Sequence, residues 1–400
     1  MNRLAGGRIS GGAAFAGAAY AFAAVMLGTT IPTPLYVLYR ARFGFSELII
    51  TVIFATYAAG VIGALLLFGA LSDQVGRRPV LALGLLFSAL SAGAFLLAQS
   101  LGLLLVGRVL SGLSAGIFTG TATATLVDLA PAERRGGATL VATVANMGGL
   151  GLGPLVAGVV SQVGPLPLRL SFWVDLGVLV PAAAVIWLMP EPVGDRGGRG
   201  LRPQGLTVPA DIRPIFVRAA LAGFAGFAVL GLSTAVSPAF LGALGVSSRA
   251  EVGAVVFAVF AASTAGQALL EAVSQRAALL AGCAGLIVGM AVFAAALAIS
   301  SLPLLIVGAM LAGLGQGLSF RAGLAAVNSA APADQRGEVA SSFFVVAYVA
   351  LSLPVIGEGV LAELAGLRTA GLVFAGAVAA LAAVALALLA QRRLRDEGSD

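Results

Sequence analysis

Residues 69–78 read Gly-Ala-Leu-Ser-Asp-Gln-Val-Gly-Arg-Arg, a charged segment framed by glycines that lies between two long apolar stretches. Glycine allows close helix packing and tight turns, so Gly69 and Gly76 predict a short, sharply turned connection between two helices. The paired arginines that end the segment are favoured by the negative surface of a cytoplasmic leaflet. Asp73 has two possible roles, because it can cap the next helix or pair with Arg77.

The composition of the chain indicates a membrane protein. Of its 400 residues, 60% are apolar and 10% are charged, and the mean hydropathy is +1.04. A soluble domain of this length cannot hide so much apolar surface, so the chain needs lipid as its solvent. The 23 cationic residues are all Arg and are spread over short loops, which excludes a nucleic-acid-binding face and fits membrane topology.

The sequence also limits the kinds of functional site. It contains no His and one cysteine, Cys283, so we expect no metal site, no cofactor and no disulfide framework. We find no phosphate-binding loop for ATP and no soluble stretch long enough for a catalytic domain. An enzyme is therefore not expected.

Apolar runs of about 20 residues predict twelve membrane spans. Backbone polar groups inside a bilayer must be satisfied within the chain, so the spans are expected to be helices in an all-α fold. Arg3 and Arg8 precede the first run as in a signal peptide, but the run is too long and lacks a cleavage site, which favours a retained helix. The spans lie near residues 13–36, 48–70, 80–98, 101–123, 138–160, 170–189, 215–240, 250–270, 278–300, 302–325, 338–360 and 367–390.

The spans fall into two groups of six. Pro, Gly and Arg replace the apolar pattern over residues 191–214, which predicts a cytoplasmic linker. The linker separates an N-terminal six-helix bundle, residues 1–190, from a C-terminal six-helix bundle, residues 215–400. Because Arg in short loops is retained on the cytoplasmic side, its distribution predicts that both termini are cytoplasmic.

An internal repeat supports this division. The sequence Gly-Leu-Ser-Ala-Gly at 112–116 recurs as Gly-Leu-Gly-Gln-Gly at 313–317, and 130–136 recurs as 331–337 at the same offset of 201 residues. Parallel repeats of this kind predict two pseudo-symmetric bundles with a site at their interface near the bilayer midplane.

The decapeptide resembles the G-x-L-[AS]-D-x-x-G-R-[RK] signature of the major facilitator superfamily, which lies in the loop between its second and third helices. The resemblance implies that superfamily's fold over nearly the whole chain. It also implies a charge cluster that latches the two halves in the outward-open state. The alternative is a positive-inside turn with a helix cap. The residues concerned are Gly69, Asp73, Gly76, Arg77, Arg78 and, at the end of the fourth span, Asp128.

Arg108 lies inside the fourth predicted span, where a guanidinium costs about 3 kcal/mol on insertion scales. It resembles the first residue of a second superfamily signature, R-x-x-Q-G-x-x-x-G, except that Ser111 replaces the Gln. In that signature the Arg is linked to proton transfer. Arg stays charged, so its role would be electrostatic, whereas the alternative is a structural hydrogen bond.

The fifth span resembles the antiporter signature G-x-x-x-G-P-x-x-G-G through Gly149, Gly153, Pro154 and Gly158, with Ala157 at the penultimate position. Small residues allow close helix packing and the proline bends the helix, which suits a gate. The resemblance implies the twelve-helix drug/proton antiporter group and therefore export. Plain close packing is the alternative.

Proton coupling needs a carboxylate within a span, and few spans contain one. Asp175 and Glu358 are the candidates, unless each lies near the outer interface and is merely solvated. Arg321, in the tenth span, is a candidate partner for an anionic group or a cation that reaches the interface.

The sequence thus predicts a secondary active transporter that exports small hydrophobic or cationic compounds in exchange for protons. One alternative is an uptake uniporter or symporter of a small metabolite, and another is a non-transporting membrane sensor. Arg without Lys, beside abundant Ala and Gly, indicates a GC-rich bacterial genome and hence the bacterial inner membrane. The resemblance implies a monomer.

Overall fold

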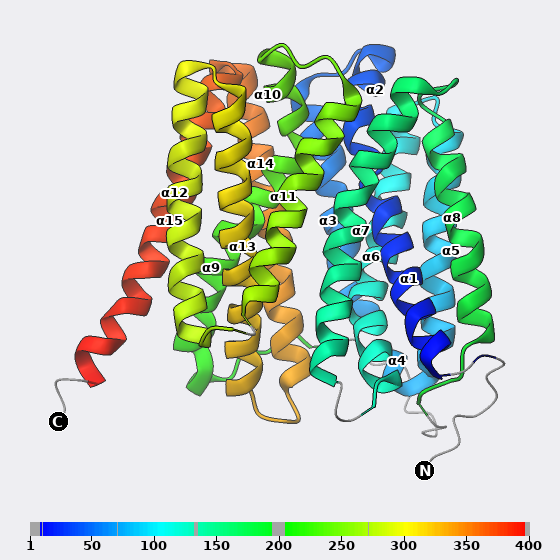
Figure 1. Cartoon of the computed structure of the whole chain (residues 1–400), viewed down its shortest axis with the longest axis vertical. Coiled ribbons are helices and arrows are strands. Elements are labelled where there is room, and N and C mark those ends of the chain that lie inside the picture. The colour runs from blue at the N-terminus through cyan, green and yellow to red at the C-terminus, as the bar shows by residue number, and fades with distance from the viewer. Residues whose placement is uncertain are drawn as a thin grey trace. The chain divides into compact units, whose positions relative to one another are not determined.

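A computed structural model of the chain describes residue 9 and residues 11–69, 71–131, 135–193, 205–270 and 272–396. Twelve helical stretches in these ranges are long and apolar enough to cross a membrane. Figure 1 draws the helices of the chain as ribbons. The predicted all-α membrane fold with twelve spans is therefore confirmed. Residues 194–204 of the expected linker lie outside the described residues.

The chain forms two compact units. Unit 1 contains Met1–Gly44, Thr56–Gly205 and Ser248–Gly253, and unit 2 contains Phe45–Ala55, Leu206–Ser247 and Ala254–Asp400. The helices that begin in the first half of the chain are α1 (Gly11–Thr30), the 3-10 turn η1 (Thr33–Leu35), α2 (Tyr36–Phe43), α3 (Glu47–Phe68), α4 (Leu71–Val75), α5 (Arg77–Leu96), α6 (Leu101–Leu129), α7 (Arg135–Val163) and α8 (Leu170–Leu188).

In unit 1, α1 packs against α6, α7 and α8, while α5 packs against α6 and α8. Small residues allow these contacts. A Cβ atom on Gly112 of α6 would lie 2.2 Å from the carbonyl oxygen of Tyr57, and one on Gly60 of α3 would lie 2.5 Å from that of Val109. The two helices therefore approach to backbone contact, as small-residue interfaces in membranes do.

The second half of the chain supplies the helices of unit 2. They are the 3-10 turn η3 (Ala210–Ile212), α9 (Arg213–Ala235), α10 (Ser237–Ala243), α11 (Arg249–Leu269), α12 (Gln275–Ile299), α13 (Leu302–Ala330), α14 (Arg336–Ala365) and α15 (Leu367–Asp396). In this unit α12 packs closely on α13, and α9 packs on α13, α14 and α15. Cys283 of α12 is buried in an apolar cluster, which fits the packing role of an isolated thiol.

The observed helices differ from the predicted spans at several ends. For example, α6 extends to Leu129 and α14 to Ala365, whereas α9 ends at Ala235. The first span continues past residue 36, because η1 and α2 carry the helical path on to Phe43. The helix α1 ends at Thr30, just before Pro32 and Pro34, which lack a backbone N–H, but the span continues beyond them. The connection at 69–78 is also more ordered than a plain loop, since it contains the short helix α4.

Candidate functional site

Gly76 makes the sharp turn between α4 and α5. Its φ angle is +100°, a conformation that L-residues with a side chain rarely adopt. Gly69 ends α3, with its N–H donated to the carbonyl oxygen of Leu65 at 3.2 Å. The expectation of a tight turn at Gly76 agrees with this geometry.

Arg77 binds two acids, Asp73 of α4 and Asp128 of α6. Its Nη1 atom lies 2.7 Å from Oδ1 of Asp73 and its Nε atom donates to Oδ2 of Asp128 at 3.0 Å. Nη1 also donates to Oγ of Ser72 at 2.6 Å, and the arginine is 8% exposed. Of the two roles open to Asp73, the structure shows the pair with Arg77, and the same guanidinium ties α4 and α5 to the end of α6.

Glu191 occupies the position at the start of α5 that a capping side chain normally takes. Its Oε1 and Oε2 atoms accept the backbone N–H groups of Arg77 and Arg78 at 2.8 and 2.9 Å, and Oε1 also accepts that of Val193 at 3.3 Å. Carboxylates stabilise helix N-termini because the first N–H groups have no partner within the helix. A Cβ atom on Gly76 would lie 2.8 Å from Oε2, so this glycine also makes room for the carboxylate.

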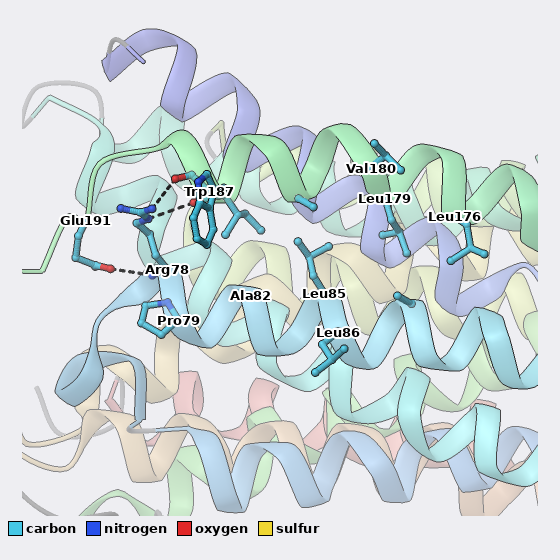
Figure 2. Close-up of a pocket in the computed structure, with 13 residues that line it drawn as sticks. Arg78, Pro79, Ala82, Leu85, Leu86, Leu176, Leu179, Val180, Trp187 and Glu191 are labelled. Carbon is cyan, nitrogen blue, oxygen red and sulfur yellow. Dashed lines mark hydrogen bonds between the residues drawn. The ribbon is translucent and has the colours of Figure 1, made fainter. Parts of the chain in front are cut away.

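Sequence reasoning did not find Glu191. The available signal was one acid between two prolines directly after the sixth span, but nothing local indicates a partner more than a hundred residues earlier. Arg78 completes the link, since its Nε and Nη2 atoms donate to the carbonyl oxygens of Ile186 and Trp187 at 3.2 and 2.5 Å (Figure 2). The start of α5 is thus joined to the end of α8.

Arg108 and Asp175 contact adjacent residues of α1, Thr29 and Gly28. Nη1 of Arg108 donates to the carbonyl oxygen of Thr29 at 2.6 Å, and its guanidinium carbon lies 4.6 Å from the centre of the Tyr57 ring. A Cβ atom on Gly28 would lie 2.7 Å from Oδ1 of Asp175, so the carboxyl group packs directly on this glycine. The sequence predicted both residues separately, and the structure places them at adjacent residues of α1.

Asp175 is buried inside unit 1. Its side chain is 3% exposed, and Oδ1 has no hydrogen-bond partner in the part of the chain that the structure describes. The hydroxyl groups of Tyr36 and Ser171 are also buried without a partner there. The sequence left open whether Asp175 lies inside the span or is solvated near the outer interface. The structure shows that its side chain is buried.

Glu358 and Arg321 lie in unit 2. Glu358, on α14, is 3% exposed, and neither carboxylate oxygen has a hydrogen-bond partner among the described residues. Arg321, on α13, donates from Nη1 to the carbonyl oxygen of Gln267 on α11 at 2.6 Å. On the same two helices, Oγ of Ser263 donates to Oε1 of Gln316 at 2.5 Å. Arg321 therefore belongs to a polar contact between α11 and α13.

The motif of α7 faces α1. A Cβ atom on Gly149 would lie 2.5 Å from the carbonyl oxygen of Ala23, and one on Gly153 would lie 2.3 Å from that of Leu27. Pro154 lies inside the helix. A Cβ atom on Gly158 would lie 2.3 Å from the carbonyl oxygen of Arg249, which belongs to the same compact unit. Each of the three glycines therefore allows a backbone contact.

Unit 2 contains an aromatic cluster that sequence reasoning missed. The rings of Phe227 and Phe320 have centres 4.8 Å apart, those of Phe227 and Tyr348 6.1 Å, and those of Phe320 and Phe344 5.9 Å. The cluster joins α9, α13 and α14. Its members are too far apart in sequence to form a motif, so only the tertiary structure brings them together.

The chain is similar in sequence to parts of several curated proteins. The chain is 24% identical over 187 residues to the quinolone resistance protein NorA of Staphylococcus aureus, a match that covers 46% of this chain and 47% of NorA. It is 29% identical over 135 residues to an uncharacterized transporter of Schizosaccharomyces pombe, covering 34% of this chain and 28% of that protein. The chain spans less than half the length of these curated relatives.

Two solved structures show the same fold over almost the entire chain. The human organic anion transporter TETRAN superposes with a TM-score of 0.69 at 19% identity, covering 95% of this chain and 100% of that one. A bacterial homolog of the human lysosomal transporter Spinster, in an inward-facing and unoccupied conformation, gives a TM-score of 0.75 at 17% identity and covers 96% and 99% of the two chains. A family model matches residues 14–353. The chain belongs to the Major Facilitator Superfamily.

Proposed function

We propose that this transporter exports small hydrophobic or cationic compounds in exchange for protons. Its moving halves would be the predicted bundles 1–190 and 215–400, joined by the linker 191–214, and a central site would open alternately to each side. The distribution of Arg supports cytoplasmic termini, and Arg without Lys supports the bacterial inner membrane. The family resemblance supports a monomer. Gly69, Asp73, Gly76, Arg77, Arg78 and Asp128 would form the conformational switch.

The observation that carries this proposal is the buried carboxyl group of Asp175. It lies within a membrane-spanning helix, and Oδ1 lacks a hydrogen-bond partner among the described residues. An ionised carboxylate in such surroundings is costly unless water or a cation reaches it. A change in access would therefore drive proton uptake or release at Asp175, which is what coupling requires. Arg108, bound to the next residue of α1, would influence that step electrostatically.

Glu358 supports a second coupling position in unit 2. Its two carboxylate oxygens are buried without a hydrogen-bond partner in the described ranges. Both units thus contain one buried carboxyl group within a membrane-spanning helix. Arg321 would act on the pathway in unit 2 through its contact with α11.

The aromatic cluster supports the class of cargo. Phe227, Phe320, Phe344 and Tyr348 offer large apolar surfaces and ring faces that attract cations. Similarity to a quinolone resistance protein agrees with a cargo of small organic compounds. The α7 motif, which resembles that of proton-driven exporters, supports the outward direction through Gly149, Gly153, Pro154 and Gly158.

Proteoliposomes that enclose a pH-sensitive dye test the proposal. We expect addition of lipophilic cations or neutral drugs to start a proton flux opposite to drug movement, and we expect this flux to be lost in Asp175→Asn or Glu358→Gln. The matched control is Glu363→Gln, which changes an exposed acid on α14 and should leave the flux intact. Proton and compound movement in the same direction would contradict antiport and support uptake. Absence of any flux with folded, oriented protein would contradict transport of these compounds.

A further inference from the structure

An apolar groove of about 740 Å³ runs between α5 and α8. Figure 2 shows that one end lies at Arg78, Trp187 and Glu191, while the other lies at Leu176 and Leu179. Leu85, Leu179 and Ile186 are buried and form its floor, whereas Leu86, Val180 and Trp187 are exposed along its sides.

Small side chains keep the groove open. Ala82 on α5 and Ala183 on α8 line it where larger residues would fill the space between the two helices. Because both helices are membrane spans, this opening faces the region that lipid occupies. The large apolar patch has no covering side chains in the described ranges, since Val180 is 69% and Trp187 76% exposed.

The polar end of the groove is suited to an anion. Both carboxylate oxygens of Glu191 accept hydrogen bonds from backbone N–H groups at the start of α5 and after α8. The Arg78 guanidinium uses Nε and Nη2 for α8 carbonyls, and its Nη1 atom has no hydrogen-bond partner among the described residues. A planar guanidinium held in place by two hydrogen bonds and with donors to spare is a typical phosphate ligand.

The length of the groove matches one leaflet of a bilayer. From Arg78 to Ala89 the α5 wall extends about 16 Å at 1.5 Å per residue. Half of the hydrocarbon core of a bilayer is about 15 Å thick. A molecule with its charged group at Arg78 and an apolar tail along the groove would thus fit within a single leaflet, and Trp187 would lie at the interface where tryptophan is favoured.

We propose that the α5–α8 groove binds an anionic phospholipid, with the phosphate on Arg78 and one acyl chain along the alanine-lined wall. The lipid would come from the leaflet on the side where α5 begins. Its binding would join α5 to α8 next to the carboxylate cap of Glu191. This site shares Arg78 with the proposed conformational switch, but it needs neither the proposed cargo nor proton coupling.

The two tryptophans of the chain, Trp173 and Trp187, both lie on α8 and provide reporters for this site. In the Trp173→Phe variant, Trp187 reports on the polar end of the groove. In the Trp187→Phe variant, Trp173 reports on the opposite end of the helix and serves as a matched control. Both positions are exposed, so bromine on lipid chains should quench either fluorophore.

The experiment measures fluorescence quenching in vesicles of phosphatidylcholine that contain increasing amounts of brominated phosphatidylglycerol, compared with brominated phosphatidylcholine. We expect Trp187 to show about a fivefold preference for the anionic lipid, the size typical of one arginine at a membrane surface. Trp173 lies one turn after Arg169, so it gives the background for an arginine outside the groove, and Arg78→Gln should leave its quenching unchanged. Arg78→Gln should abolish the preference at Trp187, and Ala183→Leu should reduce quenching by filling the groove.

Two outcomes would overturn the proposal. Equal quenching of Trp187 by both lipids would show ordinary lipid contact without a site. A preference that survives Arg78→Gln would assign it to general surface charge. If Arg78→Gln fails to fold, the Ala183→Leu variant still tests the proposal. Its larger side chain must displace a bound acyl chain, whereas headgroup attraction at the surface stays unchanged.

Discussion

The side chains of two adjacent arginines at the start of α5 bind different partners. Arg77 turns inward and binds the carboxylates of Asp73 and Asp128, while Arg78 reaches the last carbonyl groups of α8. Unpaired carbonyls at a helix C-terminus carry partial negative charge, so a cation there is stabilising. The backbone N–H groups of the same two residues bind Glu191, which therefore holds together two helices that are far apart in sequence.

Replacing Glu191 by Ala should destabilise the protein. The change leaves the backbone N–H groups of Arg77 and Arg78 without their carboxylate partner, and we expect a loss of about 2 kcal/mol. The measurement is thermal unfolding in detergent or nanodiscs. Glu363→Ala, which removes an exposed acid from α14, is the control and should have little effect. Equal stability of the two variants would show that the cap contributes nothing.

At the scale of elements, α1 and α7 are held together through glycine. Gly149 and Gly153 let the backbone of α7 reach that of α1, and the Thr30 hydroxyl donates to the carbonyl oxygen of Leu150 at 2.8 Å. Pro154 removes a backbone donor next to this contact. The same segment is therefore closely packed and contains a proline, two features of the antiporter signature that it resembles.

Alanine substitutions of two glycines in α7, Gly153 and Gly148, should change stability differently. Gly153→Ala places a Cβ atom 2.2 Å from Oγ1 of Thr30 and 2.3 Å from a backbone oxygen, so we expect a loss of about 1–3 kcal/mol. Gly148 has nothing within 4 Å of its Cβ position, and Gly148→Ala should be neutral or stabilise the helix by about 0.5–1 kcal/mol. Thermal unfolding measures both. Similar losses at the two positions would show that helix propensity, not packing, governs this segment.

At the scale of the whole molecule, transport requires exchange between two states, and a small electrostatic change can shift that equilibrium. Asp73 is largely exposed, with 63% of its side chain accessible, so its pair with Arg77 contributes little to folding. A contribution of about 1 kcal/mol is still enough to change the ratio of two conformations fivefold.

Asp73→Asn should therefore shift the population of states without lowering stability. If the connection at residues 69–78 latches the outward-open state, as the resemblance implies, the variant should favour the inward-open state. Labelling of single cysteines introduced along α1 and α9, in a Cys283→Ser background, measures access from each side. Asp211→Asn, a change at an exposed acid of η3, is the control. Unchanged labelling in Asp73→Asn would contradict the latch and favour the alternative of a positive-inside turn.

Much of the fold follows directly from the sequence. Apolar runs long enough to cross a bilayer force helices, since backbone polar groups in lipid have no other partner. All twelve spans could thus be located, although helix ends such as those of α6 and α9 differ from the predicted bounds. The first span extends to Phe43 because η1 and α2 follow α1. Among the site residues, the pair of Asp73 with Arg77 lies four residues apart on the chain and was open to prediction.

The tertiary structure decided the partners that lie far apart in the chain. Sequence determined that Arg108 and Asp175 lie inside membrane spans, but only packing placed both on adjacent residues of α1, and only the fold brought Glu191 to the start of α5. The reason is physical. Hydrophobicity and backbone hydrogen bonding act locally and can be read along the chain, whereas the rotation of each helix about its own axis depends on how its small and large residues fit its neighbours.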